Sequence, residues 1–68
     1  MIRLKEIITL LINDYEVYYK GQYIDEYTNQ IPITLDSRYS WLKDSEVTEI
    51  DTDENRSGEE HIISIYTK

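Results

Sequence analysis

The sequence has no cysteine, alanine or phenylalanine, and only two glycines and one proline. Without cysteine the chain can form no disulfide, which is typical of proteins kept in a reducing intracellular compartment. Its longest apolar-rich run, residues 7–12, is far shorter than the roughly 20 residues that span a bilayer. That run also lacks the cleavage pattern of a signal peptide. The sequence therefore predicts a cytoplasmic protein with no membrane partner.

At 68 residues the chain is expected to form a single domain, residues 1–68. A domain of this size buries only about 60% of the surface of its unfolded chain, and its core supplies about 3–5 kcal/mol of net stability. Eleven isoleucines, seven tyrosines and one tryptophan nevertheless favour a folded chain over a disordered one. Since no disulfide can stabilise the domain, homodimer formation is one alternative.

The first half of the chain predicts a helix followed by a β-hairpin. Residues 15–20 and 23–27 are rich in tyrosine and read as two strands, with Gly21-Gln22 between them as a type II′ turn. Residues 4–13 read as a helix because apolar side chains recur at helical spacing. Its predicted apolar face consists of Leu4, Ile7, Ile8, Leu11 and Ile12.

The second half predicts a short helix and a second hairpin. The helix covers residues 38–43, with Asp36 or Ser37 as its cap, and presents Leu35, Tyr39 and Leu42 on one face. Strands are predicted at residues 46–52, with Thr48 and Ile50 inward, and at residues 61–67. The predicted class is α+β: one N-terminal helix packed on a small, mostly antiparallel sheet, in the order α-β-β-α-β-β.

Basic residues are scarce, with seven against fourteen acids and a net charge of −7. Eight of the acids fall within residues 44–60, where Arg56 is the only base. Such a charge attracts basic surfaces and repels phosphate, although acidic runs also serve simply as solvated loops. The candidate partner-binding residues are Asp44, Glu46, Glu49, Asp51, Asp53, Glu54, Glu59 and Glu60.

Two of these acids have a spacing that resembles nucleic acid. On the predicted strand, Glu49 and Asp51 share one face, about 6.5–7 Å apart, which is close to the phosphate spacing along a nucleic-acid strand. This arrangement favours a charged docking face over a solvated loop.

The tyrosines offer a second candidate surface. Five of them fall within residues 15–27, accompanied by a single base, Lys20, so direct nucleic-acid binding is disfavoured. They are either core residues in place of phenylalanine or part of a protein-binding surface. Tyr18 and Tyr23 are the secondary candidates for partner binding. Trp41 is expected in the core, because tryptophan is usually well buried.

No pattern for catalysis or metal binding is present. Asp51, Asp53 and Asn55 match the start of a calcium-binding loop, but Arg56 and Ile62 stand where that loop needs glycine and glutamate. The single histidine, His61, has no cysteine or second histidine with which to hold zinc, and no nucleophile motif accompanies it. We therefore expect no enzymatic activity, no metal and no cofactor.

In its opening MIRLKEIITLL, its size and the acid-rich hairpin that ends in HIISIYTK, the chain resembles the small acidic proteins of phages and mobile elements in low-GC bacteria. Some of these are anti-defence proteins, including anti-CRISPR inhibitors. The resemblance implies a phage-type stoichiometric inhibitor, acting in the host bacterial cytoplasm, that occupies a nucleic-acid-binding surface.

Two functional hypotheses follow. The first is a non-enzymatic DNA mimic whose acidic hairpin binds the basic groove of a CRISPR nuclease or another DNA-binding host protein. The alternative is a small phage-derived interaction or structural module whose Tyr-rich hairpin makes the contact. Salt separates them, because an interface built on charge weakens steeply as ionic strength rises.

Overall fold

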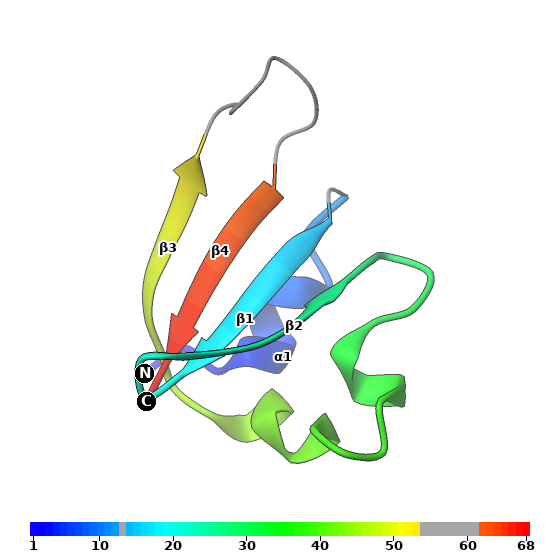
Figure 1. Cartoon of the computed structure of the whole chain (residues 1–68), viewed down its shortest axis with the longest axis horizontal. Helices are drawn as coiled ribbons and strands as arrows, with labels where there is room; N and C mark the ends of the chain where they lie inside the picture. Colours follow the sequence, from blue (N-terminus) through cyan, green and yellow to red (C-terminus); the bar gives the residue numbers. More distant parts are fainter. Residues whose placement is uncertain (13, 54–61) are drawn as a thin grey trace.

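The computed structural model describes residues 1–12, 14–53 and 62–68, which form a short helix, two 3-10 turns and a four-stranded sheet (Figure 1). The strands lie in the order β2-β1-β4-β3. In chain order the elements are α1 (Leu4–Ile8), β1 (Tyr15–Tyr19), β2 (Gln22–Tyr27), η1 (Ile33–Leu35), η2 (Ser40–Asp44), β3 (Val47–Asp53) and β4 (Ile62–Thr67).

Both predicted hairpins are present, and they meet in the middle of the sheet. β1 pairs antiparallel with β2, and β3 pairs antiparallel with β4. The neighbouring strands β1 and β4 run parallel, which makes the sheet mixed. The α+β class is therefore confirmed, whereas the predicted helix over residues 38–43 is replaced by the 3-10 turn η2, preceded by a second 3-10 turn, η1.

The N-terminal helix is much shorter than predicted. α1 begins where the Glu6 carboxylate accepts a hydrogen bond from the backbone N–H of Arg3 at 2.8 Å, and it ends at Ile8. The next turn tightens, because the N–H of Leu10 bonds back only three residues, to the carbonyl of Ile7. Ile12 lies outside the helix and is 84% exposed, so its predicted place on the apolar face is wrong.

The first hairpin turns one residue earlier than predicted. Lys20 and Gly21 are its two central residues, with φ angles of 51° and 84°, and Tyr19 pairs with Gln22. Two positive φ angles are what a type I′ turn requires, so the predicted type II′ turn at Gly21-Gln22 is wrong. Lysine adopts a positive φ only at a cost, and a two-residue hairpin loop imposes it here.

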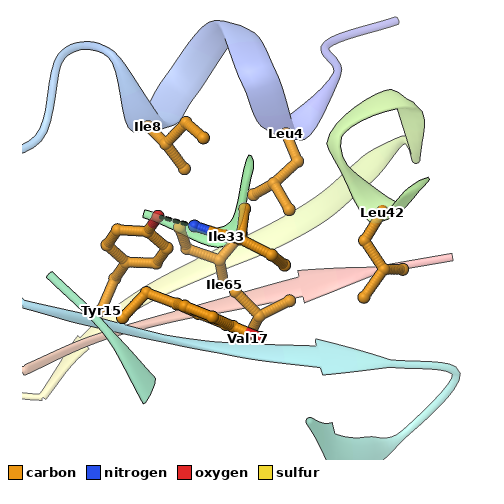
Figure 2. Close-up of a cluster of buried hydrophobic side chains, with 8 residues drawn as sticks. Leu4, Ile8, Tyr15, Val17, Ile33, Leu42 and Ile65 are labelled. Atoms are coloured by element: carbon orange, nitrogen blue, oxygen red, sulfur yellow. Dashed lines mark hydrogen bonds between the residues drawn. The ribbon is translucent and has the colours of Figure 1, made fainter. Parts of the chain in front are cut away.

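The core lies between the sheet and the layer formed by α1, η1 and η2 (Figure 2). Tyr15 reaches across the core from β1 to η1. It is 1% exposed, and its hydroxyl accepts a hydrogen bond from the buried N–H of Ile33 at 3.2 Å. Leu35 is 71% exposed, so it does not share the buried face of Leu42 as predicted. The buried apolar residues are Leu4, Ile8, Tyr15, Val17, Tyr27, Ile33, Leu42 and Ile65.

β3 is an edge strand, so Ile50 lies on the helix side of the sheet as predicted but is not buried there, and the prediction that Thr48 points into the core is wrong. Ile50 pairs with the fully buried Ile65 but remains 45% exposed, because no described strand lies beyond it. Thr48 is exposed at an irregularity in the pairing between Val47 and Glu49, and its hydroxyl donates to the carbonyl of Tyr66 at 3.2 Å.

Candidate functional site

The face of the sheet opposite the helix layer carries two rows of side chains that cross all four strands. Residues paired across neighbouring strands point to the same face, so each row follows from the strand register. The tyrosine row consists of Tyr23 (β2), Tyr18 (β1), Tyr66 (β4) and Glu49 (β3). The carboxylate row consists of Glu26 (β2), Glu16 (β1), Ser64 (β4) and Asp51 (β3). We call these eight residues the open face.

Aromatic contacts order the tyrosine row. The rings of Tyr18 and Tyr66 stack with centroids 4.6 Å apart and an angle of 18° between their planes. Tyr23 meets Tyr18 edge-on at 5.6 Å and is 53% exposed. Such pairs contribute about 0.5–1.5 kcal/mol beyond their buried area, so the row is a defined surface in the free protein.

Glu16 is the fixed member of the carboxylate row. Its carboxylate accepts hydrogen bonds from the hydroxyls of Tyr18 at 3.3 Å and Ser64 at 3.2 Å. Glu26 pairs directly opposite Glu16 on β2, an arrangement in which like charges repel. On the other side of Glu16, Ser64 separates it from Asp51, the exposed carboxylate of the row.

The hydroxyls of Tyr18 and Tyr23 stay protonated at neutral pH. Desolvation, followed by the charge of Glu16, raises the pKa of Tyr18 above its ordinary value. Desolvation, followed by the charge of Asp25, does the same for the pKa of Tyr23. Both hydroxyls are thus hydrogen-bond donors beside a row of acceptors, and the open face combines aromatic, donor and anionic groups.

The eight candidate acids differ in their positions and in whether a base lies against them. Glu49 and Asp51 lie on the open face, as their spacing on the strand predicts, and neither has a basic partner among the residues that are described. Asp53 ends β3 opposite Ile62, and its side chain is not described. Glu54, Glu59 and Glu60 lie outside the described residues.

The other two acids are already paired. Asp44 ends η2 and lies 3.0 Å from the Lys5 ammonium, which lowers the pKa of the Asp44 carboxyl. Glu46 lies 3.6 Å from the ammonium of Lys68. Pairing with a base reduces their attraction for a basic partner, so the open face is the stronger part of the predicted site.

Tyr18 and Tyr23, the secondary candidates, lie on the same face as Glu49 and Asp51. The described part of the acidic candidate surface that has no basic partner therefore shares one face with the two candidate tyrosines. Glu16, Glu26 and Tyr66 also belong to the open face, although they are not among the candidates that the sequence predicts. Strand alternation links Glu16 to Tyr18, but only the parallel pairing of β1 with β4 brings Tyr66 beside them.

Trp41 lies away from the open face and is half exposed rather than buried in the core as expected. Its side chain is 51% exposed, its indole N–H donates to the carbonyl of Arg38 at 3.1 Å, and it meets the ring of Tyr19 edge-on at 5.2 Å. Tyr19 belongs to the helix side of β1, so Trp41 borders a second, smaller aromatic surface there.

Within residues 1–12, 14–53 and 62–68, no three histidine, cysteine or acidic side chains gather as a metal site would require. His61 and Asn55 lie outside these ranges. No helix in the same ranges is long and apolar enough to cross a membrane. Comparison with known proteins finds no matching family model, no matching curated protein and no matching solved structure.

Proposed function

We propose that the protein is a non-enzymatic inhibitor that binds the basic nucleic-acid-binding surface of another protein through its open face. In keeping with the resemblance to anti-CRISPR inhibitors, the partner is a CRISPR nuclease or another DNA-binding protein in the cytoplasm of a bacterial host. The protein itself binds no nucleic acid, because phosphate contacts need lysine and arginine and the two rows contain neither.

One observation carries the proposal: Glu49 and Asp51 are exposed, share the open face with three tyrosines and have no basic partner in the described part of the chain. An acid that is not neutralised within its own fold retains its full attraction for a basic surface. Two residues apart on one strand, their Cα atoms stand about 6.5–7 Å apart, as successive phosphates roughly do.

The mechanism is competition for the same basic groove. Arginine and lysine side chains that hold the phosphates of DNA would instead pair with the carboxylates of the open face, with arginine doing so in a bidentate manner. Guanidinium groups also stack on tyrosine rings, so the tyrosine row adds affinity that phosphate alone cannot supply. The partner then cannot hold DNA and the inhibitor together.

An alternative is an interaction module in which the tyrosines provide most of the affinity. The exposed ring of Tyr23, in edge contact with Tyr18, favours it, because rigid aromatic side chains are common anchors in protein interfaces. Both functions use the open face, so they differ in the type of force rather than in location.

The test is a competition titration. The purified protein is added to a CRISPR nuclease or another basic DNA-binding protein of a low-GC bacterium, and DNA binding is followed by fluorescence anisotropy at low and at high salt. Competition predicts DNA release at about one inhibitor per partner molecule and an inhibitor affinity that falls steeply with salt. An affinity that is constant across salt would favour the tyrosine-based module, and DNA bound together with the inhibitor would contradict competition.

A further inference from the structure

The outer edge of β3 offers main-chain hydrogen-bonding groups to a further strand. On β4, the N–H of Ile63 donates to Asp14 and the carbonyl of Thr67 accepts from Lys20, so the odd-numbered residues of β4 face β1. The even-numbered residues of β4 therefore face β3, where Ser64 pairs with Asp51.

The backbone groups of β3 alternate in the same way. Because those of Asp51 face β4, the N–H and C=O groups of Ile50 and Thr52 point away from the sheet. Each of these two residues thus presents one donor and one acceptor to an incoming strand.

The beginning of this edge is already used by the chain itself. Arg3 forms an antiparallel bridge with Glu46, and the N–H of Val47 donates to the carbonyl of Ile2 at 2.8 Å. The N-terminal residues thus act as a stub of a fifth strand that stops at Val47. Within the described ranges, no strand pairs with the outer edge of β3, the edge away from β4, beyond that point.

The side chains along the edge are amphipathic. Glu49 and Asp51 project on the open face, whereas Ile50 belongs to the helix side and is 45% exposed. Ile2, on the stub beside Val47, is 54% exposed. A strand that paired here would place one set of alternate side chains against carboxylates and the other set against isoleucine.

We propose that the β3 edge binds an extended segment of a partner protein in which basic and apolar residues alternate, added as a fifth strand. Main-chain hydrogen bonds would provide affinity, and the two sets of side chains would provide specificity, as in other complexes formed by strand addition. A second copy of this chain is a poor occupant, because antiparallel pairing of two β3 strands would bring Glu49 and Asp51 against the same acids of the copy.

This contact goes beyond the proposed inhibitor function and does not depend on it. A basic groove could bind the open face without adding a strand, and a basic strand could pair with the edge of a protein that inhibits nothing. The test therefore measures strand addition alone.

The chain is short enough for total chemical synthesis, so a single backbone N–H can be replaced by an ester oxygen while every side chain is kept. One synthetic chain carries the ester at Ile50, whose N–H points outward. The matched control carries it at Asp51, whose N–H points to β4. The probe is a capped peptide of alternating lysine and valine, and a peptide of the same composition with its lysines and valines in two blocks tests for attraction by charge alone.

The unmodified chain is expected to bind the alternating peptide more tightly than the block peptide, and binding should slow hydrogen exchange at the Ile50 and Thr52 amides. The Ile50 ester should weaken binding about fivefold, the effect of losing one net hydrogen bond, and should lower the Tm only slightly, because the ester also makes the Glu49 carbonyl, which faces β4, a weaker acceptor. The Asp51 ester removes an N–H that points to β4 and also makes the outward carbonyl of Ile50 a weaker acceptor, so it should lower the Tm more and, well below that Tm, weaken binding less than the Ile50 ester does. Equal binding of the two peptides, no binding of either, or an Ile50 ester that binds normally would overturn the proposal.

Discussion

Tyr18 and Tyr66 stack with ring centroids 4.6 Å apart, across the only parallel pair of strands in the described sheet. They come from different hairpins, so their contact joins the two hairpins on the open face. The same pairing brings Ser64 beside Glu16, where its hydroxyl donates to the carboxylate. One long-range pairing thus assembles both rows of the candidate site.

We expect this stack to contribute measurable coupling energy. In a double-mutant cycle with Tyr18→Leu and Tyr66→Leu, the free energies of unfolding should be non-additive by about 0.5–1.5 kcal/mol, as for other aromatic pairs. Urea denaturation of the four proteins measures this quantity. Additive effects of the two substitutions would show that the tyrosine row is not ordered in solution.

Tyr15→Phe tests the hydrogen bond that ties η1 to the sheet. Removing the hydroxyl leaves the buried N–H of Ile33 without its acceptor, which should cost about 1–3 kcal/mol of unfolding free energy. Tyr23→Phe is the matched control, since its side chain is 53% exposed, and it should change stability by less than about 0.5 kcal/mol. Equal effects of the two substitutions in thermal denaturation would argue against the bond.

The bounds of the helix face can be tested with one substitution made at two positions. Ile8→Asp should unfold the domain, because an unpaired buried carboxylate costs several kcal/mol, comparable to the whole stability expected at this size. Ile12→Asp should be tolerated within about 0.5 kcal/mol, because Ile12 is 84% exposed. Circular dichroism melts measure both. A cooperative melt of the Ile8 variant at the wild-type Tm would show that α1 is not packed on the sheet.

Asp36 should make the fold sensitive to acid. Its carboxylate accepts hydrogen bonds from the Arg38 guanidinium and from the Tyr27 hydroxyl, and these lower its pKa from 3.8 to about 2. Because the folded state binds the proton more weakly than the unfolded state, the stabilisation is complete above about pH 4 and is lost as the pH falls towards 2.

The measurement is the Tm of wild type and of Asp36→Asn across that pH window. The variant has no carboxyl to titrate at this position, so its Tm should be lower than that of the wild type above about pH 4 and should decline less on acidification. Parallel declines in the two proteins would mean that other carboxylates govern the acid response.

Local patterns in the sequence predict the strands and both hairpins. Alternation also places Glu49 and Asp51 on one face, and the register agrees. The length of α1 is predicted less well, because apolar spacing alone does not reveal where a helix stops. Here Ile7, Ile8 and Thr9 are β-branched, poor helix formers that favour an early end.

Local sequence patterns cannot predict the whole open face, for a physical reason. The parallel contact between β1 and β4 depends on the packing of residues far apart in sequence, such as Val17 and Ile65, which are paired and both fully buried. No local signal distinguishes it from other ways to join two hairpins. Glu16 and Tyr66 become part of one surface only through that contact.

The most direct test of the central claim compares two variants with the same change in net charge. Glu49→Lys with Asp51→Lys reverses charge on the open face. The control variant makes the same change in net charge at exposed positions in the layer of 3-10 turns. It combines Asp44→Lys with Thr34→Lys and Ser37→Lys. The dissociation constant is measured for a partner identified by the competition titration.

We predict that the open-face variant binds more than about a hundredfold more weakly, because like charges placed across an interface repel by several kcal/mol, while the matched variant binds nearly as the wild type does. Equal losses in the two variants would show that only net charge matters. If the open-face variant binds normally while Tyr18→Ser with Tyr23→Ser does not, charge mimicry is wrong and the tyrosine-based module stands.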